Sequence, residues 1–222
     1  MNIIIKNLNK SYGSEKIFEN FNLELTDSKV NCIIGQSGCG KSTLLNILSN
    51  LISIDSGEIL GMKKGDISYI FQEDRLIEWL TIEENLKLAL KSYFTNDTLN
   101  KKIDSMLSML DIMNVKFKYP NELSGGMRQR VNIARAFGKT SNVILMDEPF
   151  KSLDYKLKYS IIDKFKEILL EEKRMVILVT HDVDEAIYFQ GNIIVFGNRP
   201  VEVKKIFTDE LEERKYEILK LI

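Results

Sequence analysis

Residues 35–43 read Gly35-Gln36-Ser37-Gly38-Cys39-Gly40-Lys41-Ser42-Thr43, and the first eight fit the pattern G-x-x-x-x-G-K-[ST] without a gap. The apolar run 30–34 precedes them and the stretch 44–51 follows, so we expect a strand, a loop and a helix in that order. Glycines allow backbone N–H groups to crowd around phosphate oxygens, and the N-terminus of the helix adds the positive end of its dipole. The run therefore predicts a loop that binds the phosphates of a nucleotide.

Three side chains of this loop have separate expected tasks. The Lys41 ammonium reaches the β- and γ-phosphates, the Ser42 hydroxyl is a ligand of Mg²⁺, and Thr43 holds the α-phosphate. A chance glycine-rich turn is the alternative, which the strand before the loop and the helix after it disfavour. The loop alone does not separate a transport ATPase from a GTPase or a kinase.

Short apolar runs alternate with helical patterns along the rest of the chain, which indicates an α/β fold. Strands are expected at residues 3–5, 18–25, 30–34, 66–71, 143–146, 175–179 and 193–196, and helices at 44–51, 124–137 and 161–170. A turn is expected at 12–14. The runs 143–146 and 175–179 are apolar without alternation, as in a parallel sheet covered on both faces.

The stretch from residue 81 to about 115 has the spacing of amphipathic helices. Its apolar residues form two stripes, Ile82, Leu86 and Leu90, then Ile103, Leu107 and Leu110. We interpret it as a helical subdomain inserted between parts of the sheet. The charged tail 209–222 is either a terminal helix or a frayed end. Its helical stripe consists of Leu211, Tyr216 and Leu219.

Two adjacent carboxylates, Asp147 and Glu148, follow the apolar run 143–146, at the end of the strand where open α/β sheets bind ligands. Successive strand residues point to opposite faces, so the two acids are expected to have different tasks. Asp147 is placed to hold Mg²⁺, directly or through water, and Glu148 to polarise the attacking water as a general base. A strand-ending turn with two solvated acids is the alternative.

The single histidine, His181, follows the apolar run 175–179. Its place at the end of a strand predicts a contact with the γ-phosphate, with Glu148 or a backbone carbonyl as its partner. A purely structural histidine is the alternative.

A second candidate anion site is the segment Leu123-Ser124-Gly125-Gly126-Met127-Arg128-Gln129-Arg130. The Ser124 hydroxyl and the N–H groups of Gly125 and Gly126 lie at the start of the helix expected over 124–137, where an anion is stabilised. One chain thus carries two phosphate-binding loops. A nucleotide could be held between residues 35–43 of one subunit and the Ser124 loop of another.

With this segment the sequence resembles the ABC ATPase family over nearly its whole length. The motifs stand in the family's order: GQSGCGKST (35–43), SYIFQ (68–72), LSGGMRQR (123–130), ILMDEP (144–149), SLD (152–154) and THD (180–182). The resemblance implies the P-loop NTPase fold of ABC ATPases: a mostly parallel core sheet, an antiparallel β subdomain and an inserted α-helical subdomain. It also implies one ATPase domain over 1–222, with the helical subdomain at about 81–136.

The family resemblance further implies an ATP hydrolase with ATP and Mg²⁺ as cofactors and a head-to-tail dimer that closes on two ATP molecules. Tyr12 resembles the aromatic residue that stacks on adenine, although a turn tyrosine is the alternative. Gln72 resembles the residue that links Mg²⁺ and water to the permease contact. Asp154 resembles the residue that couples the two sites across the dimer.

Within the family, the chain is similar to importer subunits for nitrate, sulfonate and taurine, and to relatives for thiamine precursors. The segments that carry this similarity are 71–81, 147–154, 180–186 and 198–200. Glu78 departs from the proline that those relatives often have before Trp79, and Lys151-Ser152 departs from two small residues. The chain also looks short at its C-terminal end, and no second regulatory domain is expected after Pro200.

The segment 73–95 follows the glutamine motif and contains the apolar Trp79 and Leu80. We expect it to dock the cytoplasmic helix of a membrane permease. The alternative is that Trp79 packs inside the helical subdomain.

Composition sets further limits. The 222 residues suffice for one buried core, and a net charge of -1 disfavours a nucleic-acid binder. Cys32 and Cys39 lack metal-ligand spacing, so reduced structural thiols are expected. No apolar run is long enough to span a bilayer, so a membrane role requires docking onto another chain. The expected partners are a second ATPase subunit, permease subunits and, indirectly, a solute-binding protein, at the cytoplasmic face of the cell membrane.

Three alternatives to an importer subunit remain: an exporter ATPase subunit, a non-transport ABC ATPase, and a small-molecule or nucleotide kinase. Long coiled-coil insertions or a second ATPase domain would indicate the non-transport class, and the chain has neither. A kinase would leave the segment 123–130 and His181 unexplained.

Overall fold

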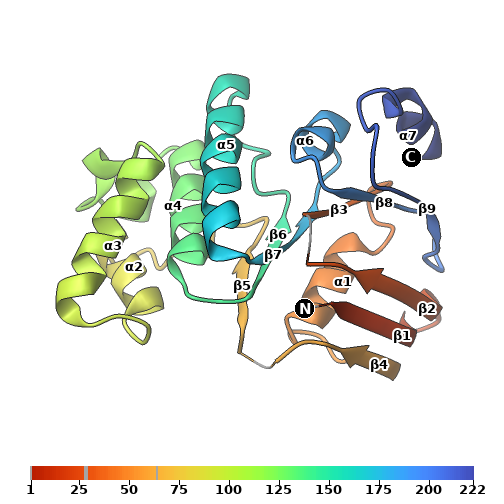
Figure 1. Cartoon of the computed structure of the whole chain (residues 1–222). Helices are drawn as coiled ribbons and strands as arrows, with labels where there is room; N and C mark the ends of the chain where they lie inside the picture. The colour runs from red at the N-terminus through yellow and green to blue at the C-terminus, as the bar shows by residue number, and fades with distance from the viewer. Residues whose placement is uncertain (1, 28–29, 64) are drawn as a thin grey trace.

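The computed structural model describes residues 2–27, 30–63 and 65–222, and two sheets organise them (Figure 1). The smaller sheet is antiparallel and has the strand order β2-β1-β4. Its strands are β1 (Ile3–Tyr12), β2 (Glu15–Leu25) and β4 (Ser56–Leu60). The predicted turn joins β1 to β2. Strand β4 lies outside the predicted strands because its residues are exposed or half-buried and show no apolar alternation.

The larger sheet has the strand order β5-β6-β7-β3-β8-β9. Its strands are β3 (Asn31–Ile34), β5 (Ile67–Ile70), β6 (Val143–Asp147), β7 (Met175–Val179), β8 (Asn192–Phe196) and β9 (Val203–Phe207). All neighbours pair in parallel except β9, which is antiparallel to β8. The predicted α/β fold with a mostly parallel core sheet beside an antiparallel one is confirmed.

Alternate residues of the larger sheet face two separate hydrophobic clusters. Val143 and Leu145 belong to a cluster that also holds helix α1 (Lys41–Leu48) and the inner faces of β1 and β2. Ile144 and Met146 belong to a second cluster, formed with the other helices. Strands β3, β7 and β8 alternate in the same way. Helix α1 is therefore enclosed between the sheets, and the parallel strands are buried on both faces, as their apolar runs predict.

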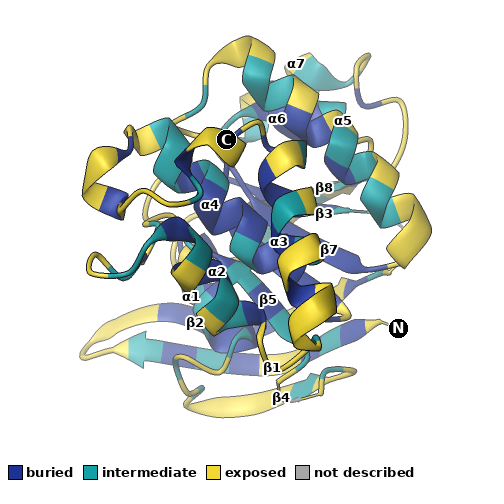
Figure 2. Cartoon of the chain, turned by 90° about the vertical axis from the view of Figure 1, so that its left-hand side faces the viewer, coloured by how far each residue is buried: buried dark blue, intermediate teal, exposed yellow. Residues whose placement is uncertain are grey.

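The other helices cover the opposite face of the larger sheet. Within the described ranges they are α2 (Ile82–Leu90), α3 (Asn96–Met109), α4 (Gly125–Gly138), α5 (Tyr155–Glu172), α6 (Val183–Tyr188) and α7 (Lys215–Leu221), with 3-10 turns at Met113–Val115 and Pro120–Glu122. Figure 1 places α2 and α3 at the end of the molecule away from the smaller sheet, and Figure 2 shows α4 largely buried. The single ATPase domain with a helical subdomain at 81–136 stays a prediction. Each helix in the described parts of the chain is too short or too polar to cross a bilayer.

Polar caps set the start of four helices. Thr81 begins α2 with a capping box: its Oγ1 accepts from the Glu84 N–H at 3.3 Å, and the Glu84 carboxylate accepts from the Thr81 N–H at 2.8 Å. Ser124, Asp154 and Asp182 cap α4, α5 and α6 by accepting from a backbone N–H three residues on. Three motif residues of the sequence are therefore also helix starts.

Some predicted boundaries differ from the structure. Helix α1 begins at Lys41 rather than at the predicted residue 44, and α5 begins at Tyr155 rather than at residue 161. In both helices the N-cap, Gly40 or Asp154, sets the start, and apolar spacing does not reveal a cap. The short elements β9 and α6 were not predicted from the sequence. The tail forms α7 rather than a frayed end. Of its predicted stripe, Leu211 is buried, but Tyr216 and Leu219 are exposed, and Ile218 is the buried residue of the helix.

A stacked aromatic pair joins α4 to α5 in the core. The rings of Phe137 and Phe165 lie 3.8 Å apart between centroids and 5° from parallel, and both side chains are buried. Phe150, from the loop after β6, packs beside Phe165 at 5.9 Å. The site loop after β6 thus rests on the same aromatic cluster that fixes the two helices.

Phe165→Ala should lower the free energy of unfolding by about 3–5 kcal/mol, because it removes a ring from the cluster and leaves a cavity. Urea unfolding of the purified protein measures this loss. Leu170→Ala is the matched control on the same helix, since Leu170 is 81% exposed, and it should change the free energy by less than about 0.5 kcal/mol. Equal losses in the two variants would contradict a core role for Phe165.

Candidate functional site

The phosphate loop connects β3 to α1, with Gly40 at the N-cap of the helix. Gly40 has φ of 130°, and a Cβ there would lie 2.9 Å from Ile17 and 3.0 Å from Val201. Only glycine fits this close approach. A hollow of about 270 Å³, called the phosphate hollow here, opens over the loop. Its lining residues are Ser37, Gly38, Gly40, Lys41, Ser42, Thr43, Gln72, Glu148, Lys151, Val179 and Arg199.

The Lys41 side chain lies inside the loop. Its Nζ donates to the carbonyl oxygens of Gly35 and Gln36, both at 2.8 Å, and the residue is buried. The ammonium is thereby held among backbone groups at the start of α1, where an anion would be stabilised. Cys39 is buried beside it, and both cysteines are free thiols.

The two predicted carboxylates lie in different surroundings. Asp147 is buried at the end of β6 on the side of the sheet that faces α1. Burial raises the pKa of Asp147 above its usual value, the neighbouring Glu148 carboxylate adds to this, and the Ser42 hydroxyl and Lys41 oppose it. Glu148 leaves the strand with φ of 45°, a region that non-glycine residues seldom adopt, and its N–H donates to the Val179 carbonyl at 2.9 Å.

The Glu148 carboxylate has one basic side chain at each oxygen. His181 Nδ1 lies 3.2 Å from Oε1, and Lys151 Nζ lies 2.8 Å from Oε2. Burial alone would raise the pKa of Glu148, but Lys151 and His181 outweigh it and hold the pKa below its usual value. Of the two partners considered for His181, the structure selects Glu148. Adjacent acids with pKa values pushed in opposite directions are a feature of catalytic sites.

A partly buried polar cluster lies next to the His181 loop. The Lys158 ammonium of α5 lies 2.5 Å from Asp182 Oδ2 and 3.8 Å from Glu185 Oε2 of α6. Burial raises the pKa of Glu185 to about 7, and the nearby Lys158 opposes this. These contacts fix the start of α6, and with it the loop that presents His181.

Gln72 lines two hollows at once. One is the phosphate hollow, and the other, of about 470 Å³, lies between the segment 72–78 and the start of α4. Ser42, Gln72 and Asp147 offer oxygen atoms, the donor type that Mg²⁺ prefers. Ser42 and Gln72 share the phosphate hollow, and Ser42 contacts Asp147. The predicted metal-binding residues are thus grouped, and the set suits Mg²⁺.

The second anion loop lies apart from the first. Ser124 caps α4, and the Gly126 backbone packs on the carbonyl of Ser152, which a Cβ would meet at 3.2 Å. Among the described residues that line the phosphate hollow, none comes from 124–126. The chain does not bring its two predicted phosphate loops together. Asp154, predicted to couple two sites, is the N-cap of α5 and accepts from the Leu157 N–H at 3.0 Å.

Three further side chains complete the comparison with the sequence. Tyr12 lies at the end of β1 with its ring half exposed, and it does not line the phosphate hollow. Lys151 and Arg199 do line it, although the sequence assigned neither to the site. Both are cations inside the recognised segments 147–154 and 198–200, which is the signal that could have found them. Arg199 forms an ion pair with Glu15 of β2.

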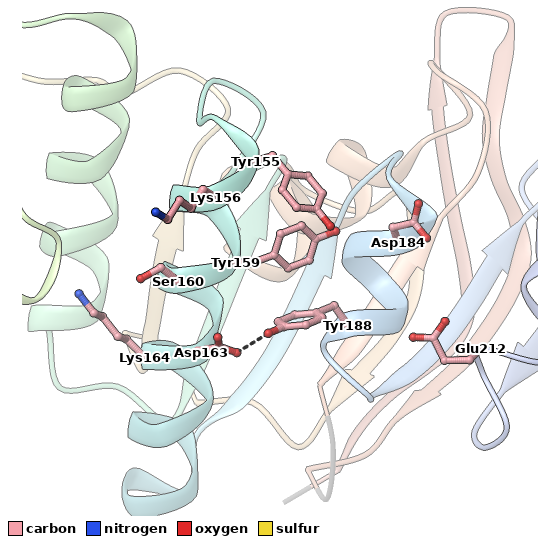
Figure 3. Close-up of a pocket in the computed structure, with 9 residues that line it drawn as sticks. All are labelled: Tyr155, Lys156, Tyr159, Ser160, Asp163, Lys164, Asp184, Tyr188 and Glu212. Atoms are coloured by element: carbon pink, nitrogen blue, oxygen red, sulfur yellow. Dashed lines mark hydrogen bonds between the residues drawn. The ribbon is translucent and has the colours of Figure 1, made fainter.

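A larger hollow, of about 820 Å³, lies elsewhere, between α5, α6 and the C-terminal tail (Figure 3). Tyr155, Tyr159 and Tyr188 form a ladder of rings with centroids 4.6 and 4.5 Å apart, and the Tyr188 hydroxyl donates to Asp163 at 2.7 Å. The ladder joins α5 to α6. The phosphate loop contributes nothing to this hollow, so size does not identify the phosphate site.

The segment after Gln72 is tied to α4 by charged groups. Arg128 donates from Nε and Nη2 to the two oxygens of Asp74, at 2.7 and 3.1 Å, and from Nη2 to Glu78 at 2.6 Å. Arg135 donates to the carbonyls of Asp74 and Arg75. These contacts make the segment and α4 one unit.

Trp79 projects from this segment into solvent, with 79% of its surface exposed. The loop that carries it is fixed by the buried Asn85 side chain, which accepts from the Ile77 N–H at 2.8 Å and donates to the Leu80 carbonyl at 3.0 Å. The alternative that Trp79 packs inside the helical region is wrong. An exposed tryptophan on a rigid loop is typical of a surface that binds a partner.

Comparisons with known proteins agree on one family. A family model described as ABC transporter matches residues 18–151. An aliphatic sulfonates import ATP-binding protein, SsuB of Bacillus cereus, is 37% identical over 95% of this chain and 86% of its own length. An uncharacterized ABC transporter ATP-binding protein, YtlC of Bacillus subtilis, is 40% identical over 79% of this chain and 70% of its own.

Two solved structures of an ABC transporter cassette are similar to this chain. The ABC transporter cassette MJ0796, solved as a dimer, superposes with a TM-score of 0.83 at 31% identity, over 92% of this chain and 97% of that one. The same cassette in a post-hydrolysis state with ADP and Pi superposes with a TM-score of 0.82.

The buried Glu185 should make stability depend on pH. Its pKa is about 7 in the folded chain and near 4.5 when unfolded, so the folded chain binds the proton more tightly. This carboxyl therefore contributes most stability below pH 4.5, and the contribution falls by about 3 kcal/mol as pH rises to 7.

Glu185→Gln should remove that slope from urea unfolding curves recorded between pH 4.5 and 7. Glu167→Gln removes the same charge from an exposed position on α5 and serves as the control. A slope that survives in Glu185→Gln would exclude this carboxyl as its source.

Proposed function

The chain belongs to the ABC transporter family, and we propose that it is the ATPase subunit of a solute importer, acting as a dimer beneath a separate membrane permease. Family membership makes it an ATP-binding protein that hydrolyses ATP, with an adenine nucleotide as ligand. The predicted resemblance to this family is confirmed. Import, the permease and the roles of individual residues are the proposed parts.

One observation supports the proposal of a dimer. The chain has an anion loop at the N-terminus of α1 and another at the N-terminus of α4, and only the first lines the phosphate hollow. In the proposed assembly, Ser124, Gly125 and Gly126 of the partner subunit close over the γ-phosphate held by residues 35–43. The dimeric solved relative supports this arrangement. Tyr12 would lie beside the adenine, outside the phosphate hollow. Asp154, at the start of α5, would face the partner.

For hydrolysis, we assign Glu148 as the base that accepts a proton from the attacking water. Its lowered pKa keeps the carboxylate ionised. His181 Nδ1 lies 3.2 Å from Oε1 and would hold the carboxylate in its orientation. Lys41 stabilises negative charge on the phosphates from inside the loop. Ser42, Gln72 and Asp147 would hold Mg²⁺, which when bound neutralises charge between the β- and γ-phosphates. Because Gln72 lines both hollows, it would link the phosphates to the segment 73–95.

Transmission to the permease is assigned to the Trp79 loop. Closure of the dimer moves the Ser124 loop and α4, and Arg128 and Arg135 couple that movement to the segment carrying Trp79. A cytoplasmic helix of the permease would cover the exposed indole. The chain would then work on the cytoplasmic face of the membrane without touching the cargo.

The proposed cargo class is a small organic anion of the sulfonate type. It rests on relatives named for the import of aliphatic sulfonates. An exporter subunit or a non-transport ABC ATPase would share the nucleotide site, so the docked partner distinguishes the three.

Co-purification tests the proposal. The tagged protein is isolated from gently solubilised native membranes, and its partners are identified. A polytopic permease together with a solute-binding protein supports import, and that binding protein can be screened with alkane sulfonates. A permease without a binding protein would indicate export, and ribosomal or DNA-repair partners would contradict transport.

Glu148→Gln should lower the turnover number for ATP by at least about 10²-fold, because it removes the base. The variant should still bind ATP and should accumulate as a closed dimer with it. Steady-state phosphate release and size-exclusion chromatography with MgATP measure the two effects. Normal turnover in this variant would exclude Glu148 as the base.

Trp79→Ala should leave the ATPase activity of the isolated subunit within about twofold, because Trp79 does not line the phosphate hollow. Permease-stimulated activity and transport should fall by at least about tenfold, as expected for an interface anchor. Reconstituted vesicles with the co-purified permease measure both. Tyr216→Ala, another exposed aromatic, is the control on α7. Parallel loss of isolated and coupled activity would contradict a docking role.

A further inference from the structure

Lys151 is a cation of the phosphate hollow that the proposed mechanism does not use. Its ammonium lies 2.8 Å from Glu148 Oε2, and both side chains line the hollow together with Gly38, Lys41 and Ser42. A backbone contact from the Lys151 N–H to the Glu148 carbonyl, at 3.4 Å, holds the two residues in one turn. The turn therefore fixes the Lys151 backbone beside the proposed base.

The Glu148 oxygen next to Lys151, Oε2, can still accept a hydrogen bond. Oε2 is buried and accepts no hydrogen bond of good geometry, although the ammonium lies close to it. The other oxygen, Oε1, faces His181. Lys151 thus stands where a water molecule would have to be to give its proton to Oε2. In this arrangement the ion pair shields the base.

The Lys151 side chain is 54% exposed, and a lysine carries its charge on a long flexible stem with many accessible rotamers. A nucleoside triphosphate in the hollow presents several negative charges against the single charge of Glu148, and Coulomb attraction grows with charge. In the proposed placement of the nucleotide, a diphosphate lacks the γ-phosphate and so offers Lys151 one negatively charged group fewer.

We propose that Lys151 is a second phosphate-binding cation of the site: when ATP binds, its ammonium leaves Glu148 and contacts the γ-phosphate. The inference rests on the proposed placement of ATP in the phosphate hollow. The exchange frees Glu148 Oε2 for the attacking water only when a γ-phosphate is present. Lys151 then favours ATP over ADP and links substrate recognition to the release of the base.

Nucleotide titrations test the contact. Dissociation constants are measured with Mg²⁺ for the non-hydrolysable analogue AMP-PNP and for ADP. Lys151→Met should weaken AMP-PNP binding about tenfold and leave ADP binding unchanged, because one charge-assisted contact is lost. Lys151→Arg should keep the preference for the triphosphate. Lys156→Met, an exposed lysine outside the phosphate hollow, is the matched control and should change neither constant.

A double-mutant cycle tests the exchange. Glu148→Gln removes the competing carboxylate charge, so it should raise the AMP-PNP to ADP preference several-fold when Lys151 is present. The same substitution in a Lys151→Met background should raise that preference less, because it then relieves only the direct repulsion between Glu148 and the γ-phosphate. Equal effects of Glu148→Gln in both backgrounds would overturn the exchange, and equal weakening of both nucleotides in Lys151→Met would overturn the γ-phosphate contact.

Lys41→Met separates failure of this inference from failure of the proposed site. It should abolish binding of both nucleotides. If Lys41→Met binds them like the parent protein, the phosphate hollow is not the nucleotide site. If it loses both while Lys151→Met keeps the parent preference, the site stands and Lys151 has no part in recognising the γ-phosphate.

Discussion

Parallel pairing of β3, β6 and β7 is the constraint on which the site depends. Because these strands run in the same direction, their carboxyl ends meet at one edge of the sheet. The phosphate loop follows β3, Asp147 and Glu148 end β6, and His181 follows β7. Two backbone contacts continue across this edge, from the Glu148 N–H to Val179 and from the Thr180 N–H to Ile33. Segments more than a hundred residues apart are thereby set within hydrogen-bond reach.

Electrostatics at this edge follow from burial and from which cations lie near. Asp147 is buried beside α1 and has a raised pKa, whereas Glu148 turns away from the strand toward His181 and Lys151 and has a lowered one. The unusual φ of Glu148 is what separates the two neighbours. A partly buried carboxylate with a basic side chain near each oxygen, as Glu148 has, is stabilised as an anion. In the proposed exchange it becomes available as a base when Lys151 leaves.

Rigidity extends from this edge to the surface. The aromatic cluster around Phe165 supports the loop after β6, and the Lys158 cluster supports the loop after β7. Arg128 and Arg135 fix the Trp79 loop to α4. The proposed importer would use these contacts to pass movement from nucleotide to permease, because charged and packed contacts transmit displacement where solvated loops do not.

The sequence by itself determined the phosphate loop, the acid pair, the order of motifs and the buried strands. Each depends on local spacing: glycines at a helix start, apolar runs without alternation, and carboxylates directly after such a run. Only the tertiary structure decided that His181 and Lys151 take opposite oxygens of Glu148, that Trp79 is exposed, and that Ser124 lies apart from the phosphate hollow. It also placed β4, β9 and the buried side of α7. These outcomes depend on which distant segments pack together, and a local sequence pattern does not specify the distant segment that it will contact.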